Sequence, residues 1–434
     1  MTGKEGQELS RTEAWAVLRR LVEASRTDIV RLLWPDGDSS APAQVERVVS
    51  ALGQGNGNLP PGLRGLTPAR SALVLRRARE DLEWASAHHW RLITPDDDEW
   101  PTVRLDEAFN CIGDLDTAEP ADDGDTAPGP RDAEAGARQG VTASDAPETG
   151  VRRSAARPFA LWGLGPAQLS GTVERSVAVV GTRSSTTYGE RTTRRFAGEL
   201  AAAGYTVVSG GALGTDTAAH RGALEADGST VMVAACGPGV VYPRSNADLF
   251  RQIAGTGLLV TEYPPGTTPA RYRFLTRNRL VAALTRGTFL AAAGYRSGAV
   301  NTANWADAML RPVMVLPGPV DSAAFVGCHR RIRDGAGTLV TRSSEIREII
   351  EPLGSVDCDG QLDLEFTASP VQQLSRDQLS VFDCCGIVSD DTGRIEQIAG
   401  QTGLPLVAVV RTLRELERTG LIVRSGDRWL KNDR

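Results

Sequence analysis

A dense group of arginine and aromatic side chains occupies residues 271–279, directly before an apolar run at 280–284. A guanidinium group binds phosphate oxygens as a fork, and an aromatic ring stacks on an unpaired base. The window therefore suits a single-stranded nucleic acid, although taken alone such a cluster is more often an ion-paired surface that faces water. Its members are Arg271, Tyr272, Arg273, Phe274, Arg277, Asn278 and Arg279.

Glycine-rich loops offer a second kind of phosphate contact. Gly210 and Gly211, which follow Ser209, precede a predicted helix and let the backbone approach a ligand closely. The free N–H groups and the dipole at a helix start favour an anion. Two similar loops lie at 181–183 and 294–301, and an arginine is near each of the three. There is no Walker A lysine and no clean GxGxxG with a following acidic residue, so we expect phosphate groups but no cofactor.

Catalytic groups are sparse. Asp216 and His220 are four residues apart on a predicted helix, with Ser209 upstream, which superficially offers a carboxylate, a base and a nucleophile. Capping and packing of the helix start is the favoured interpretation of these three residues. The four histidines lack metal-ligand spacing, and the six cysteines contain no CxxC pair. We therefore expect neither a metal nor an enzyme.

The charge is unevenly distributed. The chain of 434 residues has a net charge of −6, but residues 113–150 alone carry −8. Residues 151–350 hold 23 arginines against 13 acidic residues, a net charge of +10, as expected for a domain that binds a polyanion. No leader segment is recognisable and no apolar run approaches the roughly 18 residues of a membrane helix. These features predict a cytoplasmic protein without a membrane partner.

Composition and periodicity divide the chain into five segments. Residues 1–112 should form a small helical domain, with helices at 10–33, 43–52 and 67–87. Residues 113–150 are acidic and poor in large apolar side chains, which predicts a disordered segment. A plain linker is the favoured interpretation of this segment, and an acidic mimic of a nucleic-acid strand is the alternative.

Residues 151–350 alternate short apolar strands with helices, which predicts a Rossmann-like, doubly wound, mostly parallel α/β sheet. The polar loops then lie at the carboxyl ends of the strands, where such sheets bind ligands. A second linker is expected at 351–374. Residues 375–434 read as three short helices and a hairpin, the order of a winged helix, and both duplex DNA and a protein remain open as its partner.

Six sequence blocks in a fixed order resemble the DNA-processing protein A (DprA/Smf) family. They are VAVVGTR (177–183), SGGALGTDTAAHRGAL (209–224), YPRSN (242–246), TEYPPGTTPARYRFLTRNR (261–279), RSGAVNTA (296–303) and VLPGPV (315–320). The resemblance implies binding of single-stranded DNA, a homodimer and delivery of the strand to the RecA recombinase during natural transformation. It places the binding pocket at Arg183, Phe274, Arg277, Asn278, Arg279, Arg296, Ser297 and Gly298. Leu275, Thr215 and Ala291 depart from the family pattern.

The leading hypothesis is therefore a single-strand binder and recombination mediator with no catalytic residue. Its expected DNA contacts are the eight residues implied by the resemblance together with Ser209, Gly210 and Gly211. A nucleotide-binding or nucleotide-hydrolysing Rossmann-like protein is the first alternative. A duplex-DNA regulator acting through the C-terminal domain is the second.

Overall fold

The computed structural model describes residues 9–23, 26–37, 42–54, 68–113, 156–351, 370–387 and 392–432. The chain divides into two compact units, residues 1–356 and 357–434. The predicted acidic linker at 113–150 lies outside the described residues apart from Gly113, so its disorder stays a prediction. The linker predicted at 351–374 is described only at its two ends.

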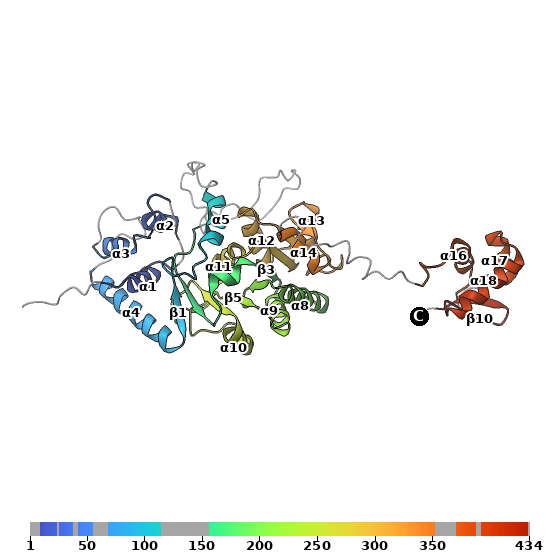
Figure 1. Ribbon diagram of the computed structural model, residues 1–434, viewed down its shortest axis with the longest axis horizontal. Coiled ribbons are helices and arrows are strands. Elements are labelled where there is room, and N and C mark those ends of the chain that lie inside the picture. Colours follow the sequence, from blue (N-terminus) through green and yellow to red (C-terminus); the bar gives the residue numbers. More distant parts are fainter. Residues whose placement is uncertain are drawn as a thin grey trace, which may run out of the picture. The chain divides into compact units, whose positions relative to one another are not determined.

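A nine-stranded sheet forms the centre of the first unit, in the order β1-β2-β6-β5-β4-β3-β7-β8-β9 (Figure 1). The strands from β6 to β9 in this order are parallel, whereas β2 runs antiparallel to both β1 and β6. The predicted mostly parallel, Rossmann-like sheet is thereby confirmed. The strands are β1 (Trp90–Ile93), β2 (Leu161–Leu164), β3 (Ser176–Gly181), β4 (Thr206–Ser209), β5 (Thr230–Val233), β6 (Leu258–Thr261), β7 (Thr288–Ala292), β8 (Val313–Val315) and β9 (Thr338–Leu339).

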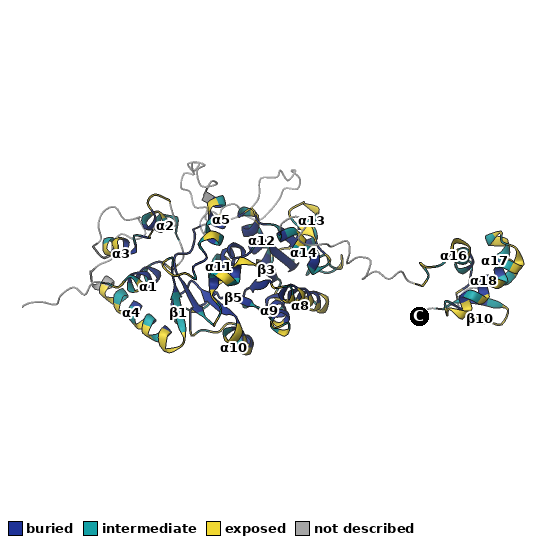
Figure 2. Ribbon diagram, in the orientation of Figure 1, coloured by how far each residue is buried: buried dark blue, intermediate teal, exposed yellow. Residues whose placement is uncertain are grey.

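Helices cover both faces of the sheet. Figure 1 shows α8, α9 and α10 on one side and α11 and α12 on the other. The helices that pack around the sheet are α5 (Thr102–Gly113), α7 (Leu169–Glu174), α8 (Thr187–Ala202), α9 (Thr215–Glu225), α10 (Ala247–Thr256), α11 (Arg271–Ala283), α12 (Gly298–Ala308), α13 (Val326–Arg333) and α14 (Ser343–Ile350). All residues of β4, β5, β6, β7 and β8 are buried (Figure 2), as expected for parallel strands packed on both faces.

The order of the strands creates a switch point beside β3. The chain moves outward from β3 through β4 and β5 to β6, and then crosses back to β7, which pairs with β3 on its other side. The loops that leave β3 and β7 therefore diverge and open a crevice at the carboxyl ends of these strands. Helix α11 lies in the crossover from β6 to β7 and so enters the same region.

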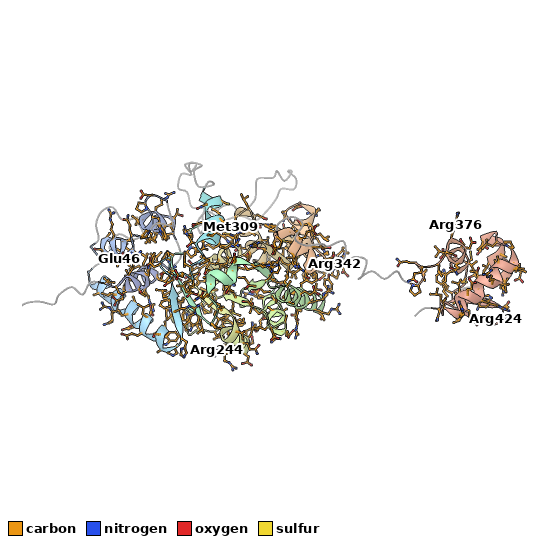
Figure 3. The ribbon with its side chains drawn as sticks, viewed as in Figure 1. Glu46, Arg244, Met309, Arg342, Arg376 and Arg424 are labelled. Carbon is orange, nitrogen blue, oxygen red and sulfur yellow. The ribbon has the colours of Figure 1, made fainter. Side chains whose placement is uncertain are left out.

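Four helices at the N-terminus pack around a core of their own. They are α1 (Arg11–Leu21), α2 (Thr27–Leu33), α3 (Val45–Gln54) and α4 (Pro68–Ala87). The single helix expected at 10–33 is two helices, because the backbone becomes extended at Val22 and Arg26. Glu46 of α3, labelled in Figure 3, pairs with Arg11 of α1 at 2.9 Å. Residues 90–113 leave the helical group, since β1 joins the large sheet and α5 packs against its core.

The second unit has the element order that the sequence predicts. Helices α16 (Arg376–Asp383), α17 (Ile395–Thr402) and α18 (Leu406–Arg418) precede the antiparallel pair β10 (Ile422–Ser425) and β11 (Arg428–Lys431). Its assignment as a winged helix stays a prediction. In neither unit does a described helix combine the length and the apolar character that crossing a membrane requires.

Candidate nucleic-acid interface

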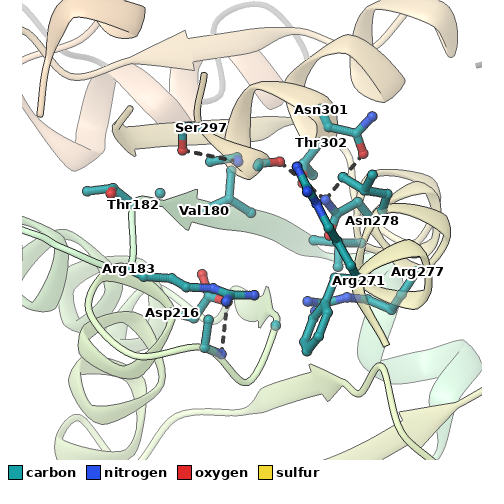
Figure 4. Close-up of a pocket in the computed structure, with 18 of the residues that line it drawn as sticks. Val180, Thr182, Arg183, Asp216, Arg271, Arg277, Asn278, Ser297, Asn301 and Thr302 are labelled. Atoms are coloured by element: carbon teal, nitrogen blue, oxygen red, sulfur yellow. Dashed lines mark hydrogen bonds between the residues drawn. The ribbon is translucent and has the colours of Figure 1, made fainter. Parts of the chain in front are cut away.

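A cavity of about 870 Å³ lies in the crevice at the switch point. Its wall is built from the loop after β3, from Gly210 and the following loop after β4, from Tyr242 after β5, from the pocket-facing side of α11, and from residues 294–302 after β7. Figure 4 shows side chains from these separate elements gathered around one hollow. The topology therefore brings together five segments that are far apart in the sequence.

Four arginines line this pocket: Arg183, Arg271, Arg277 and Arg296. Arg183, Arg271 and Arg296 are exposed, and in the described part of the chain none of the three forms an ion pair. Three guanidinium groups that face solvent without a carboxylate partner remain available to phosphate oxygens. The pocket is thus a cationic hollow rather than a neutral, ion-paired surface.

Arg277 forms the floor of the pocket and is only 5% exposed. One of its terminal nitrogens donates to the carbonyl oxygen of Val233 at 2.6 Å, while its Nε has no hydrogen-bond partner. Burial lowers the pKa of Arg277 and raises that of the nearby Asp216 carboxyl, and the attraction between the two side chains opposes both effects. The Arg277 guanidinium group is thus a buried cation whose charge is opposed mainly by the Asp216 carboxylate.

Gly210 provides the space that the Arg277 side chain occupies. A Cβ atom built on Gly210 would lie 2.2 Å from a terminal nitrogen of Arg277 and 2.6 Å from a carboxylate oxygen of Asp216. Side-chain crowding therefore favours glycine here, and the predicted close approach of a ligand to this backbone stays a prediction.

Aromatic side chains form one wall of the pocket. Phe274 is half-buried, and the guanidinium carbon of Arg183 lies 4.9 Å from its ring centroid. The Tyr242 ring contacts Phe274 with centroids 5.6 Å apart and planes inclined by 54°. Such faces, flanked by cations, are suited to stacking on unpaired bases.

The side of the pocket next to α12 is lined by amide and hydroxyl groups. The Asn278 side-chain nitrogen donates to the carbonyl oxygen of Gly298 at 3.2 Å and to the side-chain oxygen of Asn301 at 3.3 Å. The Ser297 hydroxyl accepts from the Ala299 N–H at 3.3 Å and caps α12. These bonds fix α11 against the start of α12, so that the two helices present one continuous wall.

Three of the expected contact residues lie outside the pocket. Arg279 is fully buried and donates to both carboxylate oxygens of Glu262, at 2.6 and 2.8 Å, so its assignment as a phosphate ligand is corrected. The Ser209 hydroxyl is buried and donates to the carbonyl oxygen of Val179 at 2.6 Å. Gly211 packs beneath Phe250, where a Cβ atom would lie 3.1 Å from the ring. The structure brings the remaining eight together: Arg183, Gly210, Phe274, Arg277, Asn278, Arg296, Ser297 and Gly298.

His220 is engaged in the interior of the protein. Its Nε2 lies 2.7 Å from the carbonyl oxygen of Gly210 and its Nδ1 lies 2.7 Å from the Thr230 hydroxyl. Burial lowers the pKa of His220 to about 4. Both ring nitrogens are thus used in packing β4 and β5 against α9, and neither bonds to Ser209. Among the described residues no group of histidine, cysteine or carboxylate side chains has a metal-binding arrangement.

Several pocket residues did not enter the expected set. Arg271 belongs to the arginine-rich window but is not among the predicted DNA contacts, because one helix start carries several arginines and the sequence does not tell which of them turn inward. Tyr242 stands in the YPRSN block and Asn301 in the RSGAVNTA block, so their place in these blocks was an available signal. Tyr295, which is 61% exposed, had no signal beyond its neighbour Arg296.

Comparison with known proteins gives consistent matches. The model of the family described as DNA recombination-mediator protein A matches residues 142–351. A DNA processing protein DprA of Mycobacterium tuberculosis is 38% identical over 416 residues, which cover 96% of this chain and 93% of that protein. The protein Smf of Escherichia coli is 34% identical over 256 residues, covering 57% of this chain and 65% of that protein. The crystal structure of DNA processing protein A from Streptococcus pneumoniae superposes with a TM-score of 0.56 at 22% identity, covering 80% of this chain and all of that chain, and it shares the fold.

Proposed function

This chain belongs to the DNA recombination-mediator protein A family, and from that premise we propose that it binds single-stranded DNA in the pocket beside α11. The observation that carries the proposal is the convergence of four arginines and a stackable phenylalanine on one hollow of about 870 Å³. The proposed DNA contacts are Arg183, Gly210, Phe274, Arg277, Asn278, Arg296, Ser297 and Gly298.

The pocket chemistry favours an unpaired strand over a duplex. Phe274 and Tyr242 offer ring faces to a base, and a base reaches such a face only when it has left its own stack. The exposed guanidinium groups of Arg183, Arg271 and Arg296 would hold the phosphates on either side of that base.

Binding should tolerate any sequence. Stacking and phosphate contacts are common to all nucleotides, because every base has a π-face and every link has the same charge. The side-chain nitrogen of Asn278 is already used within the protein, which reduces its capacity to read a base edge. Three or four phosphate contacts imply that the logarithm of the affinity falls with the logarithm of the salt concentration with a slope of about −2 to −3.

We also propose that the protein acts as a non-enzymatic mediator, forms a homodimer, and passes the bound strand to the RecA recombinase. The family description as a recombination mediator supports this role. The C-terminal unit, as a winged helix, would contribute a separate contact to duplex DNA or to protein. Deleting residues 370–434 tests that division, since single-strand binding should persist.

A salt-controlled titration tests the main proposal. Fluorescent oligo-dT, a duplex of the same length and dTMP are each titrated with the full chain at several salt concentrations. We expect the single strand to bind more tightly than the duplex, and dTMP to bind weakly. Stabilisation by dTMP in a thermal shift without binding of oligo-dT would overturn the proposal in favour of a nucleotide-binding protein.

A further inference from the structure

The first turn of α11 lacks the residues that usually stabilise a helix N-terminus. Its N-cap residue Ala270 has no side chain that can accept a hydrogen bond from the free N–H groups. The turn carries Arg271 and Arg273 and no acidic residue, although the positive end of the helix dipole favours negative charge. This is the same turn from which Arg271 and Phe274 enter the pocket. Its stability therefore bears directly on the site.

A carboxylate from the N-terminal helical group lies against this turn. The Tyr272 hydroxyl donates to a carboxylate oxygen of Glu23, just beyond α1, at 2.8 Å. The guanidinium group of Arg273 forms an ion pair with the same carboxylate and also donates to the carbonyl oxygen of Thr268. The Arg273 side chain is only 14% exposed, so this ion pair is partly shielded from water. Glu23 thus supplies the negative charge that the helix start lacks.

The later turns of α11 have a separate anchor. The guanidinium group of Arg279 donates hydrogen bonds to the Glu262 carboxylate. A terminal nitrogen of Arg19 in α1 lies 3.5 Å from an oxygen of the same carboxylate. The three side chains are at most 1% exposed, and burial lowers the pKa of Arg19 to about 10. This buried cluster holds the part of α11 that carries Arg277. The first turn is contacted instead by Glu23 and by the Tyr263 hydroxyl, which donates to the carbonyl oxygen of Arg273 at 3.2 Å.

We propose that Glu23 is a positioning residue of the pocket, whose carboxylate holds the first turn of α11 so that Arg271 and Phe274 stay directed at the bound strand. The inference rests on the proposed single-strand binding. In this proposal the N-terminal helical group stabilises the first turn of α11, at the edge of the pocket. It does so through a contact that is separate from the buried cluster.

The direction in which the affinity for DNA changes when Glu23 is replaced distinguishes a positioning role from a long-range charge effect. Removing a carboxylate makes the protein more positive, which by long-range attraction alone would tighten binding to DNA. If Glu23 positions the turn, Glu23→Ala instead weakens binding. We expect a two- to fivefold faster dissociation of oligo-dT, about the size of a helix-terminus charge interaction.

The experiment measures dissociation of oligo-dT from the full chain by stopped flow. Glu23→Ala is compared with Glu80→Ala, which removes an exposed carboxylate of α4 that pairs with Arg76 and not with α11. Hydrogen exchange of the amides at 271–275 is measured in the same variants, with the amides at 280–283 as the internal reference. We expect faster dissociation and faster exchange at 271–275 in Glu23→Ala alone, with an unchanged melting temperature.

A double-mutant cycle with Arg273→Met provides the second test. Because Glu23 acts through this arginine, Glu23→Ala should have a smaller effect in the Arg273→Met background than in the wild type. Unchanged or slower dissociation of Glu23→Ala, in a wild type that binds oligo-dT, overturns the inference and leaves the proposed function standing. A wild type that does not bind oligo-dT overturns both.

Discussion

The guanidinium carbon of Arg183 lies 4.9 Å from the ring centroid of Phe274, so a cation covers the aromatic face that lines the pocket. The two residues come from different segments, the loop after β3 and the first turn of α11. Under the proposed function, a base that stacks on this face of Phe274 would have to displace the guanidinium group, which could then bind a neighbouring phosphate. Base stacking and phosphate binding would then be coupled at this wall.

Phe274→Ala should weaken binding of oligo-dT by about 1–3 kcal/mol, because it removes a stacking face. By contrast, Phe274→Tyr should retain most of the affinity, since the aromatic face remains. Fluorescence anisotropy at constant salt measures both variants. Equal affinities of Phe274→Ala and wild type would show that no base stacks at this ring.

Arg183→Ala and Arg296→Ala should each remove one phosphate contact. We expect weaker binding and a salt slope that is smaller in magnitude by about 0.7 for each substitution, with little change in stability because both side chains are exposed. Arg244→Ala is the matched control, because Arg244 is exposed on the same unit but does not line the pocket. A control that lowers the slope as much as the two pocket variants would contradict the proposed site.

Gly210→Ala should disturb the pocket floor without any change of charge. The added methyl group would overlap the Arg277 guanidinium group and the Asp216 carboxylate, both of which would have to move. We expect a loss of oligo-dT affinity of at least tenfold together with a destabilisation of about 1–3 kcal/mol. Gly171→Ala is the control, since a Cβ atom there meets no atom within 4 Å.

Arg279→Met should destabilise the protein rather than remove a DNA contact. Breaking a buried ion pair costs about 3–5 kcal/mol, whereas an exposed pair contributes about 1 kcal/mol or less. Urea unfolding should therefore show a large loss for Arg279→Met and a small one for Arg194→Met, whose exposed partner is Glu225. A stable Arg279→Met protein that fails to bind oligo-dT would restore Arg279 to the binding site.

The prediction that Arg279 binds phosphate was wrong, because the sequence does not show which arginine of the motif faces the pocket. Arg277 and Arg279 stand two positions apart in one motif, which places them about 200° apart around a helix. One of them must face away from the pocket, and only the position of Glu262 after β6 decides that it is Arg279. The residue types predict a phosphate-binding site, which stays a prediction, and the choice between the two arginines depended on a tertiary contact.

The central α/β pattern was predictable, whereas the two antiparallel strands towards one edge of the sheet were not. The central strands of the sheet are short apolar segments that alternate with helices, and this alternation predicted the mostly parallel sheet. Strand β1 contains an arginine and strand β2 contains a glycine, so neither gave a clear period. They join the sheet because β2 pairs with β6 across a long separation in sequence, which local patterns do not reveal.

Acid should destabilise the first unit through His220. Its pKa is about 4 in the folded protein and about 6.5 when unfolded, so between these values the unfolded chain binds more protons. The contribution of His220 to the free energy of unfolding is therefore fully present above pH 6.5. It is lost as the pH falls towards 4, by about 3 kcal/mol in total. Urea unfolding between about pH 4 and about pH 7.5, a range that includes both pKa values, measures the loss. His220→Asn should lower stability at neutral pH but flatten the pH dependence, and an unchanged slope in this variant would assign the acid sensitivity to other groups.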